Sequence, residues 1–281
     1  MPVIAPSILS ADFANLERDI HDIERSGADW VHVDVMDGIF VPNISIGIPV
    51  VKALRPVTSL PLDVHLMIDR PIRYAEEFIK AGADWLTIHL ESDQPQNTLA
   101  CLDKIRAMGC KAAISLKPKT PAEAAIPYLT KCDMVLVMTV EPGFGAQKFM
   151  ADMMPKVKKI RQMLDEVNPA CIIEVDGGVD AVTYRTCREN GAEALVTGSA
   201  AITARTSSSR AAPISRPPTG RRSSRPFARN HFPVRNEPGS HLGTGFGLCV
   251  LSSRSPESSW RGWDGAACGW PCSRSGGYAP G

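Results

Sequence analysis

The chain has 281 residues, of which 44% are hydrophobic and 22% are charged. This composition is close to that of ordinary globular proteins and excludes a collagen-like or wholly disordered chain. The formal net charge of +1 hides an internal division. Residues 1–205 carry 21 basic and 27 acidic side chains, whereas residues 206–281 carry 10 arginines and 3 acidic side chains. The chain therefore consists of two parts with different chemistry.

No stretch of the sequence reaches the roughly 18 apolar residues that a membrane-spanning helix needs. The N-terminus has no basic segment, and acidic residues begin at Asp12, so neither a secretory signal nor a transit peptide is expected. The cysteines of residues 1–205 show no CxxC spacing and are expected to be reduced thiols. These features predict a cytoplasmic protein that does not contact a membrane.

Eight short apolar runs rich in β-branched residues recur along the first 200 residues. The runs begin near Val3, Trp30, Pro61, Trp85, Lys111, Met134, Cys171 and Ala194. Eight strands alternating with helices over about 200 residues predict an α/β fold, the (β/α)8 TIM barrel, at the small end of its size range. An open doubly wound sheet would carry a GxGxxG motif after its first strand, where this chain has Ser7-Ile8-Leu9-Ser10.

The stretches between these runs have the periodicity of amphipathic helices. In residues 15–26, Leu16, Ile20 and Ile23 recur at i, i+4 and i+7, and residues 155–167 carry a similar apolar stripe. Glycine directly after a helix tolerates the left-handed conformation that stops the helix. Such a glycine stands between a helix and the next strand at Gly27, Gly82 and Gly191.

Residues 203–281 differ from the rest of the chain. In residues 206–281, Ser, Arg, Pro and Gly account for 44 of 76 residues, and no helical or alternating pattern lasts a full element. Such a segment buries too little apolar surface to offset its ordering entropy, so it is predicted to be disordered. Arginine without lysine, together with three of the five tryptophans, is typical of GC-rich DNA read out of frame. We therefore hypothesise a shift of reading frame near residues 200–205, which sequencing of the gene tests.

Polar residues gather where the strands of the barrel end, which is where this fold places its catalytic groups. His32 and Asp34 are two residues apart on one strand and so point to the same face. Burying them in an apolar run is costly unless they are paired or bind a metal. With His65 and Asp176, which end two other strands, they form a set that suits Zn²⁺, Fe²⁺, Mn²⁺ or Co²⁺. His89 is expected to have a supporting or packing role.

Glycine-rich loops follow the sixth, seventh and eighth strands. Their backbone can approach an anion closely, and the loops after strands seven and eight are the usual phosphate site of a TIM barrel. These loops, which predict a phosphorylated ligand, are residues 143–147, Gly177-Gly178 and Gly198-Ser199. Met36, Met67 and Met138 stand near the same end of the strands, either as core filler or as an apolar lid over the reacting carbons.

Six motifs together resemble the ribulose-phosphate 3-epimerase family: APSILSADF, WVHVDVMDGIFVPN, LDVHLM, VEPGFGAQ, EVDGGV and VTGS. The resemblance covers residues 1–202 and implies a TIM barrel of the ribulose-phosphate-binding type. It implies an isomerase of the pentose phosphate pathway that interconverts D-ribulose 5-phosphate and D-xylulose 5-phosphate. It also implies one divalent metal ion, no organic cofactor, and the homo-oligomeric assembly that is common in the family.

The resemblance also implies roles for individual residues. The metal ligands would be His32, Asp34, His65 and Asp176, and the proton carriers would be Asp34 and Asp176. One carboxylate would remove the proton on C3 to give an enediolate, and the other would return a proton on the opposite face. Substrate and phosphate would contact Ser7, His65, Gly143, Phe144, Gly145, Ala146, Asp176, Gly177, Gly178, Gly198 and Ser199.

Two features depart from the family. The family usually has glycine where this chain has Ala146, and a positive φ there would strain an alanine. After Ser199 the family continues into a final helix that packs against the barrel, whereas this chain soon enters its Arg/Ser/Pro-rich tail. The eighth helix is therefore expected to be missing, which would weaken the barrel.

Other functions remain as alternatives. An epimerase for a related ketohexose 6-phosphate, such as allulose 6-phosphate, would use the same groups. A phosphate-barrel decarboxylase would need an Asp-x-Lys-x-x-Asp array, where this chain has His-x-Asp. The arginines of the tail allow phosphate contacts with RNA, but the tail has no RGG or RS repeat, so a nucleic acid partner is not expected.

Overall fold

The structure is a computed structural model that describes residues 1–198. Four predictions fall outside the described residues. They are the substrate contact of Ser199, the missing eighth helix, the disordered tail and the frame shift near residues 200–205.

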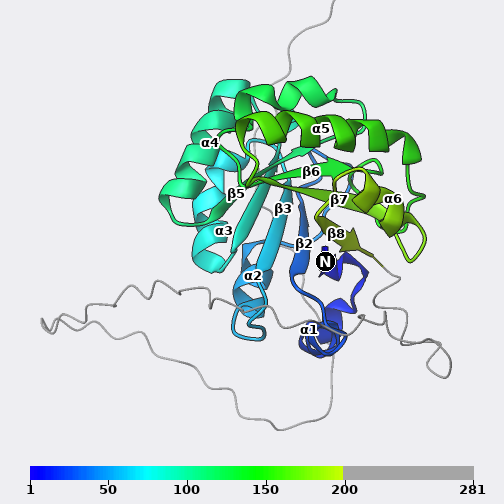
Figure 1. Ribbon diagram of the computed structural model, residues 1–281. Coiled ribbons are helices and arrows are strands. Elements are labelled where there is room, and N and C mark those ends of the chain that lie inside the picture. Colours follow the sequence, from blue (N-terminus) through cyan, green and yellow to red (C-terminus); the bar gives the residue numbers. More distant parts are fainter. Residues whose placement is uncertain (199–281) are drawn as a thin grey trace, which may run out of the picture. The chain divides into compact units, whose positions relative to one another are not determined.

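Eight parallel strands form a single sheet that curls into a nearly closed barrel (Figure 1). The sheet order is β1-β8-β7-β6-β5-β4-β3-β2, and a parallel bridge between Ser7 and His32 joins the two ends of the sheet. This architecture confirms the predicted TIM barrel. The strands are β1 (Val3–Pro6), β2 (Val31–Met36), β3 (Leu62–Met67), β4 (Trp85–His89), β5 (Lys111–Leu116), β6 (Met134–Met138), β7 (Ile172–Val179) and β8 (Ala194–Thr197).

Helices follow the strands and cover the outside of the barrel (Figure 1). A 3-10 helix, Ala122–Tyr128, follows β5 and includes Pro127, which cannot donate a helical hydrogen bond. No helix among residues 1–198 is long and apolar enough to cross a membrane. The α-helices are α1 (Leu16–Arg25), α2 (Ile48–Leu54), α3 (Ala75–Ala81), α4 (Pro95–Ala107), α5 (Met154–Val167) and α6 (Thr183–Glu189). Shorter 3-10 turns lie at Ile8–Ser10, Phe13–Asn15, Pro71–Arg73, Leu90–Ser92 and Ala151–Met153.

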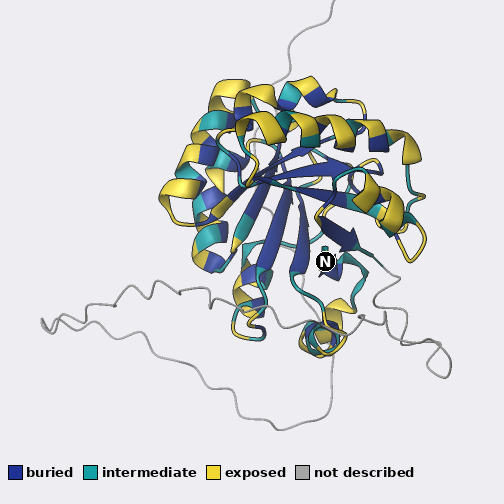
Figure 2. Cartoon of the chain, viewed as in Figure 1, coloured by how far each residue is buried: buried dark blue, intermediate teal, exposed yellow. Residues whose placement is uncertain are grey.

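Both faces of the strands are buried, as Figure 2 shows by the dark strands inside a ring of half-exposed helices. On β2, Val33 and Val35 belong to the apolar core between strands and helices. His32 and Asp34 alternate with them and therefore point into the barrel. The same alternation on β3 and β7 turns polar side chains inward, so the interior of this barrel is unusually polar for a buried space.

The helix boundaries follow the sequence signals closely. The apolar stripe predicted over residues 15–26 forms α1, and the stripe over residues 155–167 forms α5. Each predicted stop glycine has a positive φ, with values of 82° at Gly27, 115° at Gly82 and 105° at Gly191. The left-handed conformation at these positions turns the chain from the helix into the next strand.

We predict that Gly82→Ala destabilises the protein more than the matched change Gly109→Ala. Both glycines have a positive φ, so alanine costs about 1–2 kcal/mol of conformational strain at either position. At Gly82 the new Cβ would also lie 2.6–2.9 Å from the Cδ, Cγ and Cβ atoms of Arg55, whereas at Gly109 it meets nothing within 4 Å. The clash adds about 1–3 kcal/mol. Urea unfolding of both variants measures the difference, and equal losses would contradict the steric argument.

Candidate active site

The strands β2, β3 and β7 each carry two polar side chains that point into the barrel. These six side chains form two layers. The register pairs His32 with Asp63 and Asp34 with His65 across β2 and β3. All six side chains are buried except Asp176, which is partly exposed. The upper layer, toward the carboxyl ends of the strands, contains Asp34, His65 and Asp176, and the lower layer contains His32, Asp63 and Glu174.

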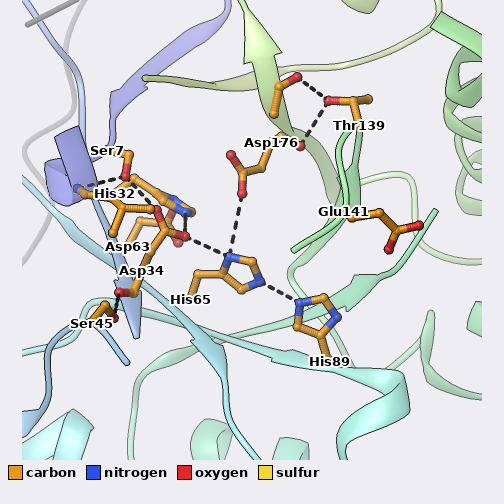
Figure 3. A network of polar contacts seen from close by, with 12 residues as sticks. Ser7, His32, Asp34, Ser45, Asp63, His65, His89, Thr139, Glu141 and Asp176 are labelled. Carbon is orange, nitrogen blue, oxygen red and sulfur yellow. Dashed lines mark hydrogen bonds and ion pairs between the residues drawn. The ribbon is translucent and has the colours of Figure 1, made fainter. Parts of the chain in front are cut away.

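The four predicted metal ligands converge in the structure (Figure 3). Asp34 Oδ1 lies 3.2 Å from His32 Nε2 and 3.3 Å from His65 Nδ1. Asp176 Oδ2 lies 3.8 Å from the same His65 Nδ1. One ligand atom from each of these four residues lies within 4.8 Å of all the others. Two imidazole nitrogens and two carboxylate oxygens at this spacing fit a single first-row divalent ion.

The lower layer supports His32 from beneath. His32 Nδ1 lies 2.6 Å from Asp63 Oδ2, which holds the ring with its Nε2 toward Asp34. The Glu174 carboxyl is fully buried and has no hydrogen-bond partner among the described residues. Burial, with the nearby charge of Asp63, raises the pKa of Glu174 well above its usual range. Glu174 is therefore a buried carboxyl beneath the site whose ionisation is opposed by its surroundings.

The two carboxylates of the upper layer differ in their electrostatic surroundings. Burial opposes ionisation of Asp34, but the charges and hydrogen bonds of His32 and His65 outweigh it and hold the pKa of Asp34 well below its usual range. Burial, reinforced by the negative charge of Asp34, raises the pKa of Asp176 to about 6. Neighbouring carboxyl groups whose pKa values are driven apart are typical of acid and base partners.

His65 also has a partner on its far side, where the structure places His89. The two Nε2 atoms are 2.9 Å apart, and His89 Nδ1 lies 3.1 Å from Glu91 Oε2. Burial lowers the pKa of His89 to about 4, so its ring is neutral at pH 7. This position supports the predicted supporting role of His89.

A cavity opens above the upper layer and brings most of the predicted substrate contacts together. His65, also a predicted substrate contact, is fully buried and is not among the described residues that line this cavity; its Nδ1 lies 3.3 Å from Oδ1 of Asp34, which does line it. Met36, Met67 and Met138 line the cavity and are also buried, so their position fits both expected roles, core filler and apolar lid. The predicted contacts that line it are Ser7, Gly143, Phe144, Gly145, Ala146, Asp176, Gly177, Gly178 and Gly198.

The glycines at the end of β7 break the regular pairing with β8. Asp176 pairs with Val196 and Val179 with Thr197, so Gly177 and Gly178 have no partner in β8. Gly178 has a φ of 65°, and a Cβ there would lie 2.5 Å from the backbone nitrogen of Phe149. Only glycine fits this position, and its bare backbone borders the cavity.

Five residues that support the site were not predicted from the sequence. Asn43 Nδ2 donates to the carbonyl oxygen of Gly143 at 2.8 Å, and Ser45 Oγ donates to the carbonyl oxygen of Asp34 at 2.7 Å. Asp63 and Glu174 each stand two residues before a predicted ligand. The alternation of side chains along a strand therefore predicts that both point into the barrel with that ligand. The unpredicted residues are Asn43, Ser45, Asp63, Glu91 and Glu174.

Comparison with known proteins agrees with this geometry. The model of the ribulose-phosphate 3 epimerase family matches residues 3–202. The chain is 48% identical over 202 residues to a ribulose-phosphate 3-epimerase of Synechocystis, covering 72% of this chain and 88% of the relative. It is 51% identical over 198 residues to a ribulose-phosphate 3-epimerase of Bacillus subtilis, and the match covers 70% of this chain and 90% of the relative. The chain belongs to the ribulose-phosphate 3-epimerase family. This membership confirms that the chain is an enzyme of the epimerase class.

Solved structures confirm the fold alone. KGPDC from Streptococcus mutans superposes with a TM-score of 0.55 at 14% identity, covering 73% of this chain and 96% of that protein. The 3-hexulose-6-phosphate synthase of Salmonella typhimurium superposes with a TM-score of 0.54 at 17% identity, and the match covers 71% of this chain and 90% of that protein. Both comparisons support a (β/α)8 barrel over the described residues.

We predict that Ala146→Gly stabilises the protein. Ala146 has a φ of 57°, the strained conformation that the sequence comparison with the family anticipated. Relief of about 1–2 kcal/mol of strain is partly offset by about 0.4–1 kcal/mol of added chain entropy in the unfolded state. The net gain lies between about 0 and 1.6 kcal/mol, with a midpoint of about 0.8 kcal/mol, in the free energy of unfolding. Ala100→Gly, in the exposed middle of α4, is the control and should lose about 1 kcal/mol. Loss of stability in both variants would refute strain at Ala146.

Proposed function

We propose that this enzyme inverts C3 of a phosphorylated ketopentose, interconverting D-ribulose 5-phosphate and D-xylulose 5-phosphate. One observation carries the proposal: the carboxyl groups of Asp34 and Asp176 both line a glycine-lined cavity, and both face Nδ1 of the buried His65. Two carboxyl groups from different strands supply the two proton carriers that inversion needs. Membership of the ribulose-phosphate 3-epimerase family supports the choice of substrate.

His32, Asp34, His65 and Asp176 would hold one divalent ion of zinc, iron, manganese or cobalt. Their donor set and mutual spacing fit such an ion. When bound, the ion would act as a Lewis acid that stabilises negative charge on the oxygens beside the reacting carbon. No organic cofactor is needed, because the reaction only moves a proton.

The chain's own groups perform the proton transfers. One of Asp34 and Asp176 removes the proton on C3 to give an enediolate, and the other returns a proton on the opposite face. Ser7 Oγ donates to Asp34 Oδ2 at 2.6 Å, which leaves Oδ1 as the oxygen shared with the two histidines. Ser7 therefore fixes the orientation of the carboxylate before substrate arrives.

The phosphate group would bind at the opposite side of the cavity, against the loops that end β6, β7 and β8. Backbone N–H groups in such loops bind phosphate without a cationic side chain. Binding energy from this remote group orients C3 between the carboxylates. The residues in this role are Gly143, Phe144, Gly145, Ala146, Gly177, Gly178, Gly198 and, by family resemblance, Ser199.

We assign the activity to residues 1–202 and place it in the pentose phosphate pathway of the cytoplasm. The five cysteines of the described part are free and buried, which is consistent with a reducing compartment. The assignment also includes the homo-oligomeric assembly common in the family and no nucleic acid partner.

Metal removal tests the first part of the proposal. Dialysis against a chelator should abolish epimerisation, and Zn²⁺, Mn²⁺, Fe²⁺ or Co²⁺ should restore it, because the enediolate needs charge stabilisation. A coupled assay with D-ribulose 5-phosphate measures the rate, and allulose 6-phosphate in the same assay tests the ketohexose alternative. Full activity of the metal-free protein would refute the metal assignment.

Asparagine substitutions test the proton carriers. Asp34→Asn and Asp176→Asn preserve side-chain volume but remove a base, so each should lower kcat by at least about 10². Asp103→Asn, on the outer surface of α4 in an ion pair with Lys131, is the control and should keep normal turnover. Near-normal kcat in both site variants would rule out the two-carboxylate mechanism.

A further inference from the structure

The two histidines of the site use opposite ring nitrogens. His32 presents Nε2 to Asp34 while its Nδ1 lies against Asp63. His65 presents Nδ1 to Asp34 and Asp176 while its Nε2 lies against His89. A neutral imidazole carries one N–H, so the nitrogen that offers a lone pair to a metal is decided by the partner of the other nitrogen. For His32 that partner is a carboxylate, but for His65 it is a second imidazole.

The contact between His65 and His89 is a hydrogen bond with a single proton. The ring centroids are 5.0 Å apart and the two Nε2 atoms are 2.9 Å apart, so the rings meet edge to edge. Only one of the two nitrogens can carry the proton between them. Figure 3 shows the resulting line of groups from Asp176 through His65 to His89.

Glu91 decides which nitrogen donates. Its Oε2 lies 3.1 Å from His89 Nδ1, and a carboxylate can only accept a hydrogen bond. His89 therefore carries its proton on Nδ1 and has a bare Nε2. That bare nitrogen accepts from His65, which must carry a proton on its own Nε2.

We propose that Glu91, acting through His89, is a positioning residue that keeps the proton of His65 on Nε2 and frees Nδ1 for a metal ion. The inference rests on the proposed function in taking Nδ1 of His65 as a ligand atom. Without this relay, the proton of a neutral His65 could move to Nδ1, where the carboxylates of Asp34 and Asp176 would attract it. The metal would then meet an N–H instead of a lone pair.

The surroundings of Glu91 make its replacement by glutamine informative. Glu91 Oε1 accepts from the backbone N–H of Lys117 at 2.9 Å and from the Thr120 hydroxyl. In Glu91→Gln the amide oxygen must stay with the Lys117 N–H, which turns the amide NH₂ toward His89 Nδ1. The nearly isosteric change therefore reverses every hydrogen bond of the relay and places the His65 proton on Nδ1.

The test compares Glu91→Gln with Glu91→Ala. Gln should weaken Zn²⁺ binding by about 10–100-fold, the usual effect of losing an outer partner of a metal ligand. Ala leaves no donor to His89 and should weaken binding less than Gln. Competition with a chromophoric chelator measures both affinities. Thr120→Val, which keeps the carboxylate, is the control and should bind Zn²⁺ as the parent protein does.

The proton itself is observed by NMR of metal-free protein labelled with ¹⁵N at histidine. His65 Nε2 should be protonated in the parent protein and unprotonated in Glu91→Gln. An unprotonated Nε2 in the parent protein, unaltered Zn²⁺ affinity in Glu91→Gln, or weaker binding in Glu91→Ala than in Glu91→Gln would overturn the proposal. Because these readouts need no substrate, a lack of epimerase activity would overturn the proposed function alone.

Discussion

The Asp34 carboxylate, enclosed by two imidazoles and a hydroxyl inside a barrel, is the group on which the rest of the site depends. Its Oδ1 faces His32 and His65, and its Oδ2 accepts from Ser7. An ion this deeply buried is costly unless every lone pair has a partner. His32 lies on the same strand as Asp34, His65 lies on β3 and Ser7 directly follows β1, so the surroundings of Asp34 require these three segments to be in register. The polar interior of the barrel is thus a consequence of this one charge.

Around Asp34 the polar groups are arranged by depth. The buried carboxyl of Glu174 and the Asp63–His32 pair lie below, while Asp176 lies above, partly exposed to the cavity. Of these groups, Asp34 and Asp176 line the cavity, whereas His32, Asp63 and Glu174 do not. The contacts that lead outward from His65 through His89 end at Glu91, whose side chain is 23% exposed. The orientation of His65 therefore also depends on a residue near the surface.

Strand periodicity and local composition were enough to predict the barrel and most of the site. The eight apolar runs gave strand starts within one residue of those in the structure, because buried strands have apolar runs bounded by turn residues. The residues 143–147 and Gly177-Gly178 converged as expected, because strand ends meet at one rim. Asn43, Ser45 and Glu91 were not predictable, since they reach the site from loops and a short 3-10 turn whose paths are determined by tertiary packing.

The contact between β1 and β2, which closes the barrel, involves residues of the candidate site. Every other neighbouring pair of strands shares a ladder of several residues. These two are joined by the bridge between Ser7 and His32 and by hydrogen bonds from the backbone N–H groups of Asp29 and Trp30 to the carbonyl oxygen of Ile4. Both residues of the bridge also contact Asp34 through their side chains. A ligand that binds this cluster therefore also stabilises the contact between the two ends of the sheet. Occupancy of the site and integrity of the fold are in this way thermodynamically linked, and the unliganded enzyme is the form most exposed to opening at that contact.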